Sequence, residues 1–225
     1  MRVLTVVGVA VLVVAAWVVP LPWAVVRPAE LVTAAEVVTV DIDADYLAAA
    51  GGRDTAVSGT YLVTAEHERV PLIRLVTAAA APGHHVVRPR RRPTGEDTLV
   101  AATMAGLGVA PRHADPSEVP VTVRLTGPAA PDRLGLSLYA FDLGATVDLA
   151  RGRRVLALGT VDARGLLQCA SPIAETVRSA AEAGVDVVVV PTPCAGNARD
   201  AVPAGSSLQV LDAAQLIEAA DALAR

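Results

Sequence analysis

The chain begins with a long run of apolar residues. Residues 3–19 carry no charged side chain, and the apolar character continues to residue 26, whereas a helix needs about 20 such residues to cross a bilayer. Trp17 and Trp23 lie toward the far end of the run, as is typical of a membrane interface, and Arg2 marks the near side as cytoplasmic. The pattern predicts a single-pass anchor in the cell membrane over residues 1–27, with the rest of the chain on the extracytoplasmic side.

A cleaved signal peptide and a buried core strand or helix are the alternatives to an anchor. The apolar region of a signal peptide is usually about 7 to 15 residues long, and small residues follow it closely. Here Pro20, Pro22 and Trp23 follow instead. The sequence therefore favours an anchor that stays attached.

Short β-branched runs alternate with turn residues over residues 28–87. The runs at 37–42, 60–65 and 70–78 are separated by Gly-Gly, Ser-Gly and charged segments, a pattern typical of short strands. Residues 88–94 then combine four arginines with two prolines, which prevents regular structure. We expect a β-rich lead-in over 28–87 and an Arg/Pro linker over 88–94, for which contact with acidic lipid or another polyanion is the alternative role.

From residue 95 to residue 225 the apolar positions switch between helical and strand periodicity. A helix that ends at Gly184 is predicted from Ile173, Val177, Ala180 and Ala181, which share one face. The remaining expected elements are helices at 94–109 and 134–150, a strand at 119–125, a hairpin at 153–167, strands at 185–191 and 208–211, and a terminal helix capped by Asp212. This alternation predicts an α/β domain.

Composition excludes several functions. The net charge is -4, so no basic field indicates nucleic acid as a partner. All 19 residues of the Lys+Arg count are arginine, and a guanidinium group keeps its proton at physiological pH. Any mechanism that needs a neutral lysine amine as base or nucleophile is therefore excluded. The sequence indicates no cofactor.

One part of the α/β domain resembles a known family. Residues 153–198 read RRVLALGTVDARGLLQCASPIAETVRSAAEAGVDVVVVPTPCAGNA. The membrane-anchored, PDZ-containing Lon-like serine peptidases of Gram-positive bacteria carry similar features in the same order: an arginine-led strand, a G-T-[IV]-D-x-x-G turn, a helix ending in Ala-Gly and a V-P-x-x-x-C segment. The anchor, the lead-in and the helix at 94–109 also look like the family's front half. The resemblance implies a Lon proteolytic-domain-like fold, of the ribosomal protein S5 domain 2-like type.

The residues that this family uses for catalysis are replaced in this chain. Lon-type peptidases use the serine of a G-P-S-A-G motif and, roughly four dozen residues later, a lysine that removes the serine's proton. The resemblance places Leu134 at the serine position and Thr176 at the lysine position. The family's PDZ module is also missing, because only about 25 residues separate Arg92 from Val119.

Other residues could in principle supply the missing chemistry. Ser137 lies three residues beyond Leu134 and is the fallback nucleophile, although its neighbours lack the glycines of a nucleophile elbow. A buried helix serine that bonds to its own backbone is the simpler interpretation. Three aspartates could supply an acid/base pair and four histidines a base, but the histidines fall in expected turns or linkers without metal-ligand spacing. These residues are Asp142, Asp148, Asp162, His67, His84, His85 and His113.

The only two cysteines, Cys169 and Cys194, flank the helix at 173–184 and the strand at 185–191. The helix climbs about 18 Å and the strand returns about 20 Å, so the two flanking loops finish at the same end. Outside the cytoplasm this geometry favours a disulfide. Two separately buried thiols are the alternative.

The sequence-based interpretation is a catalytically inactive Lon-like protein, tethered to the membrane, that acts by binding protein or peptide. The partners implied are the membrane, an active Lon-like peptidase or a peptide segment, and a second copy of the chain. Two alternatives stay open. One is an active membrane-anchored serine endopeptidase that uses Ser137, and the other is a purely structural envelope protein.

Overall fold

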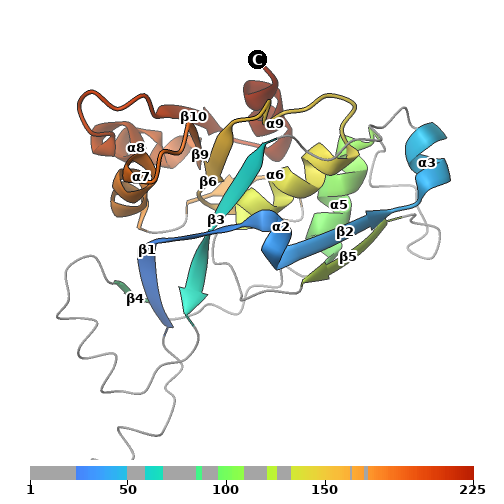
Figure 1. Cartoon of the computed structure of the whole chain (residues 1–225), viewed down its shortest axis with the longest axis horizontal. Helices are drawn as coiled ribbons and strands as arrows, with labels where there is room; N and C mark the ends of the chain where they lie inside the picture. The colour runs from blue at the N-terminus through green and yellow to red at the C-terminus, as the bar shows by residue number, and fades with distance from the viewer. Residues whose placement is uncertain are drawn as a thin grey trace, which may run out of the picture.

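A six-stranded sheet forms the centre of the computed structural model (Figure 1). The structure describes residues 24–49, 59–67, 85–87, 96–108, 121–125, 133–162, 164–169 and 172–225. The strand order is β10-β9-β6-β3-β1-β4, in which β3, β6, β9 and β10 run parallel while β1 pairs antiparallel with β3 and β4. The strands are β1 (Ala24–Thr33), β3 (Thr60–His67), β4 (His85–Val87), β6 (Arg154–Ala157), β9 (Val187–Pro191) and β10 (Gln209–Ala213).

Helices cover both faces of this sheet. One face, called the α6 face, packs against α6 and α9, with α5 on the outer side of α6, and the other, called the α7 face, packs against α7 and α8. These helices are α5 (Glu96–Gly106), α6 (Arg133–Gly144), α7 (Ile173–Glu182), α8 (Ala195–Ala201) and α9 (Leu216–Ala224). Smaller elements complete the described chain: α2 (Ala34–Val37), α3 (Ala44–Ala49), η1 (Thr192–Cys194), and the two-stranded sheets of β2 (Val38–Ile42) with β5 (Val121–Leu125) and β7 (Thr160–Val161) with β8 (Leu167–Gln168).

The central strands are buried on both faces. In β6, Val155 and Ala157 belong to the core beneath α6, whereas Leu156 belongs to the core beneath α7. All five residues of β9 are buried. Alternation along a strand places successive side chains on opposite faces, which explains why these strands read as unbroken apolar runs rather than as alternating ones.

The connections into and out of β6 have opposite hands. The chain reaches β6 through α6 and leaves it for β9 through α7. Both connections move in the same direction along the sheet, yet they cross opposite faces. One of the two crossovers must therefore be left-handed, an arrangement that is rare among parallel strands.

Most of the expected elements after residue 95 are confirmed. The helices at 94–109 and 173–184 and the strands at 119–125, 185–191 and 208–211 occur with ends shifted by a few residues. The predicted hairpin is divided. Its first part, β6, joins the central sheet, and the chain turns at Gly159, with φ 139°, before β7 pairs with β8.

Three expectations about the helices are corrected. The apolar helix predicted at 134–150 ends at Gly144, because the backbone turns there to place Asp142 beneath the N–H groups of residues 149 and 150. Asp212 lies in β10 and not at a helix end, and the cap of α9 is Gln215 with Glu218. Helix α8 and the short helices α2 and α3 were not expected.

The predicted lead-in shares the central sheet with the α/β part of the chain. Strand β3 pairs parallel with β6, and β2 pairs with β5. The division between residues 28–87 and 95–225 therefore does not coincide with a boundary of the sheet. The expected strand at 70–78 and the linker at 88–94 lie outside the described residues.

The predicted anchor lies almost entirely outside the described residues. Its last residues, 24–27, are corrected, because they belong to strand β1, which pairs with β3 and β4. In the part of the chain that the structure describes, no helix is long and apolar enough to cross a membrane.

Candidate functional site

The starts of α6, α7 and α8 lie at the carboxyl ends of β6 and β9. Helices α6 and α7 end next to the beginnings of these strands, and α8 follows β9 through η1. In α/β sheets this end commonly holds the ligand site. The two positions that the resemblance assigns to the catalytic pair, Leu134 and Thr176, both lie here.

Leu134 fills its position with an apolar side chain. It is 0% exposed and belongs to the core on the α6 face. Its backbone N–H donates to the carbonyl of Gly159 at 3.1 Å, which fixes the start of α6 against the end of β6. The position that the resemblance assigns to the serine nucleophile is thus part of the hydrophobic core.

Thr176 is also buried, with 2% of its surface exposed. Its hydroxyl Oγ1 donates to the carbonyl of Pro172, the residue before α7, at 2.7 Å. The hydroxyl therefore satisfies a local backbone group, and it has no chemistry comparable to that of a neutral amine.

Close backbone contacts join the segments around these two positions. A Cβ on Gly159 would lie 2.9 Å from the carbonyl oxygen of Gln168 and 2.9 Å from Cγ of Pro191. The end of β6, strand β8 and the end of β9 therefore meet at Gly159. The side chain of Leu134 faces the α6 core, while Val177, next to Thr176, faces the α7 core.

Ser137, the fallback nucleophile, is 0% exposed in the middle of α6. Its Oγ has no hydrogen-bond partner, so the expected bond to its own backbone is wrong while the expected burial is confirmed. A hydroxyl in this position reaches neither a base nor a substrate unless α6 moves.

Two of the three aspartates, Asp142 and Asp162, bind backbone N–H groups. Asp142 is 0% exposed and accepts a hydrogen bond from the Tyr61 hydroxyl at 2.8 Å and from the N–H of Leu149 at 3.1 Å. Asp162 accepts the backbone N–H of Arg164 at 2.8 Å and so holds the turn between β7 and β8. Asp148 is partly exposed in the loop after α6.

Burial raises the pKa of Tyr61 well above its ordinary value, and the negative charge of Asp142 and the hydrogen bond to it raise it further. The hydroxyl of Tyr61 therefore keeps its proton and remains a hydrogen-bond donor to the Asp142 carboxylate. This is what a structural contact requires. Sequence reasoning missed this pair, because the two residues are 81 positions apart and no local pattern connects them.

The histidines lie partly where they were not expected. His67 and His85 belong to strands β3 and β4 and not to turns, since each pairs with a residue of β1. His84 and His113 are outside the described residues. Within the described ranges, no group of three potential ligands is arranged to hold a metal ion.

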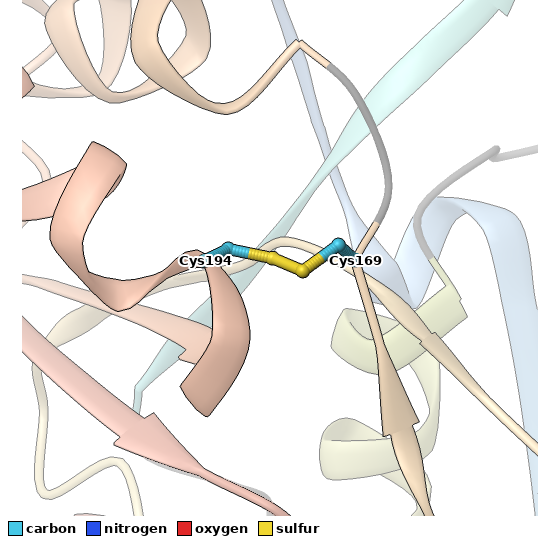
Figure 2. The surroundings of a disulfide bond; sticks show 2 residues. All are labelled: Cys169 and Cys194. Atoms are coloured by element: carbon cyan, nitrogen blue, oxygen red, sulfur yellow. A yellow bond between two sulfur atoms is a disulfide. The ribbon is translucent and has the colours of Figure 1, made fainter.

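Cys169 and Cys194 are joined by a disulfide, the pairing that helix and strand lengths favoured. Their Cα atoms are 6.1 Å apart, within the range of ordinary disulfides. Figure 2 shows the bond spanning from the segment after β8 to the start of the α8 region. Cys169 is exposed and Cys194 is buried.

A cleft of about 530 Å³ opens beside this bond, between α7 and α8. We call it the disulfide cleft. Sequence reasoning could not have found it, because its second wall is the unexpected helix α8. Its lining combines apolar and charged side chains of both signs: Cys169, Ile173, Ala174, Glu175, Arg178, Pro193, Cys194, Asn197, Asp200 and Ala201.

A second cleft, of about 730 Å³, lies between α5, the turn of the β7–β8 hairpin and the start of α9. We call it the α5–α9 groove. Neither cleft is lined by Leu134 or Thr176. No family model matches this chain, and no curated protein matches it either.

Proposed function

We propose that this protein is a catalytically inactive Lon-like protein, tethered to the membrane with its folded part outside the cytoplasm, that acts by binding protein or peptide. The observation that supports this most is what occupies the two positions that the resemblance assigns to the catalytic serine and lysine. Leu134 is a core side chain, and the Thr176 hydroxyl is bonded to the Pro172 carbonyl. The absence of lysine from the whole chain removes the ordinary base of this peptidase class.

The geometry of Ser137 argues against the enzyme alternative. A serine nucleophile needs a base within hydrogen-bonding distance and access to the substrate. The Ser137 hydroxyl is fully buried and has no hydrogen-bond partner, so it meets neither requirement.

A fluorophosphonate probe tests the proposal directly. The purified full chain should stay unlabelled under conditions in which an active serine hydrolase, mixed into the same sample as a positive control, is labelled completely. Labelling that disappears in Ser137→Ala would establish the enzyme alternative and end the proposal.

A second measurement separates binding from a purely structural role. In-cell crosslinking followed by purification of the full chain should recover a protein or peptide partner, and a full-length Lon-like peptidase is the partner that the resemblance implies. Recovery of only lipid and cell-wall material would favour a structural envelope protein.

A further inference from the structure

The α5–α9 groove has an apolar interior with firm support. Its floor is Phe141 of α6, which is 9% exposed, and its walls include Ala101 and Ala105 of α5 and Leu216 and Ile217 of α9. Helices α5 and α9 both contact α6 (Figure 1). One helix therefore holds these two walls, and the turn of the β7–β8 hairpin, with Asp162 and Arg164, closes the groove beside them.

Large apolar side chains are exposed at this groove. Ile217 is 54% exposed directly after the buried Leu216, and Leu166, which bridges to Gln215 beside the groove, is 40% exposed. Water contact with such side chains costs free energy in proportion to the exposed area. A ligand that covers them would recover this free energy, and neighbouring exposed apolar groups are typical of binding surfaces.

The charges at the groove are mainly negative. Asp97 and Asp162 line it, and Arg164 is the one basic residue among the described lining residues. The carboxylate of Asp162 is held in place by the backbone N–H of Arg164. Complementarity therefore favours a ligand with a basic side chain.

We propose that the α5–α9 groove binds an apolar peptide segment that carries a basic side chain. This inference rests on the proposed function, because it names the surface through which the inactive protein holds a peptide. The disulfide cleft fits this ligand less well. Its polar lining residues, Glu175, Arg178, Asn197 and Asp200, carry both signs of charge beside few large apolar groups.

Two matched peptides test the charge requirement. Both are ten-residue, fluorescein-labelled peptides of leucine and alanine, one with two arginines and the other with two glutamates, and their binding to the full chain is measured by fluorescence anisotropy. We expect the arginine peptide to bind more tightly. Asp97→Lys should weaken binding of the arginine peptide and strengthen binding of the glutamate peptide. Asp200→Lys in the disulfide cleft should change the binding of neither.

A matched pair of exposed positions tests the location. Ile217 and Val147 are each 54% exposed, but only Ile217 lines the groove. Ile217→Arg should weaken binding of the arginine peptide about tenfold or more, and Val147→Arg, which adds the same charge elsewhere, should leave it unchanged. Ala105→Met, which fills the groove without adding charge, provides a second variant and should also weaken binding.

Several outcomes would overturn this inference. Three of them concern the peptides: equal effects of Ile217→Arg and Val147→Arg, loss of binding in Asp200→Lys alone, or binding of neither peptide. The fourth is a dimer, seen in sedimentation, that Ile217→Arg dissociates. That result would assign the groove to a second copy of the chain. None of these outcomes changes fluorophosphonate labelling, so failure of the groove and failure of the proposed function can be distinguished.

Discussion

Arg153 and Arg154 are adjacent in the chain, yet they bind the carboxyl ends of two helices on opposite faces of the sheet. The guanidinium group of Arg153 donates to the carbonyl of Leu223 at the end of α9, and that of Arg154 donates to the carbonyls of Ala183 and Gly184 after α7. Alternation at the start of β6 explains the divergence. Positive charge at the carboxyl end of a helix also interacts favourably with the helix dipole.

This relationship predicts unequal effects of two alanine substitutions. Arg153 is partly buried and also donates to the carbonyls of Ala150 and Leu149, both at 2.9 Å, so Arg153→Ala should lower the free energy of unfolding by about 2 kcal/mol. Arg154 is exposed, and Arg154→Ala should cost about 1 kcal/mol or less. Urea denaturation measures both.

Lysine substitutions supply the control for this prediction. A lysine ammonium group keeps the positive charge but lacks the planar fork that reaches three carbonyls at once. Arg153→Lys should therefore recover only part of the loss, whereas Arg154→Lys should recover most of it. Equal losses in the two alanine variants would contradict the assigned roles.

The Tyr61–Asp142 pair predicts a loss of stability at alkaline pH. Burial and the neighbouring carboxylate raise the pKa of Tyr61 above its ordinary value near 10, so above about pH 10 the unfolded chain releases a proton that the folded chain keeps. The free energy of unfolding should then fall by about 1.4 kcal/mol per pH unit for each such tyrosine. Burial also raises the pKa of Tyr139, which adds to the slope.

Tyr61→Phe tests the assignment through the slope. The variant loses the hydrogen bond to Asp142 and should be less stable at neutral pH. Above pH 10 its free energy of unfolding should fall less steeply with pH, because the slope lacks the contribution of one titrating proton. Chemical denaturation at a series of pH values between 8 and 11.5 gives both quantities. An unchanged slope would mean that Tyr61 does not keep its proton in the folded state.

Local periodicity was enough to predict the elements that are long and regular. The runs in β9 and α7 are read correctly, because the unbroken apolar strand and the helical spacing ending at Gly184 each depend on neighbouring residues. Helix α8 was missed. It has only seven residues, and its buried positions are three alanines, Ala195, Ala198 and Ala201, which are a weak signal in an alanine-rich chain.

Contacts between distant segments could not be predicted from local patterns. The pairing of β3 with β6 joins Thr60 to Arg154, and nothing in either run indicates the other. For the same reason the lead-in was assigned as a separate unit. The disulfide is the exception, because the lengths of one helix and one strand bring Cys169 and Cys194 to the same end.

The buried hydroxyl of Ser137 predicts a stabilising substitution. A buried polar group without a partner costs about 1 to 3 kcal/mol relative to a satisfied one, and Ser137 is fully buried without a partner. Ser137→Ala should therefore raise the free energy of unfolding by about 1 kcal/mol, as measured by urea denaturation. Ser206→Ala is the control with the opposite sign, because the Ser206 hydroxyl accepts the N–H of Leu208 at 3.2 Å.

The disulfide predicts a stability that depends on reducing agent. Its cysteines are 25 positions apart, and closing a loop of this length stabilises a fold by about 3 kcal/mol through the reduced entropy of the unfolded chain. The Cys169→Ser, Cys194→Ser double variant should be less stable by about this amount. Dithiothreitol should lower the stability of the natural chain to the same level and leave the double variant unchanged.

The disulfide also lines the disulfide cleft, so its loss should lower local stability there more than in the α5–α9 groove. Hydrogen exchange of the reduced protein should rise in η1 and α8, which follow Cys194 directly, because the bond ties this segment to the end of β8. Exchange in α5 and α6 should stay the same, since these helices belong to the other core. Two free thiols in protein isolated without reductant would show that the bond does not form in the cell, and the predicted dependence on reductant would then disappear.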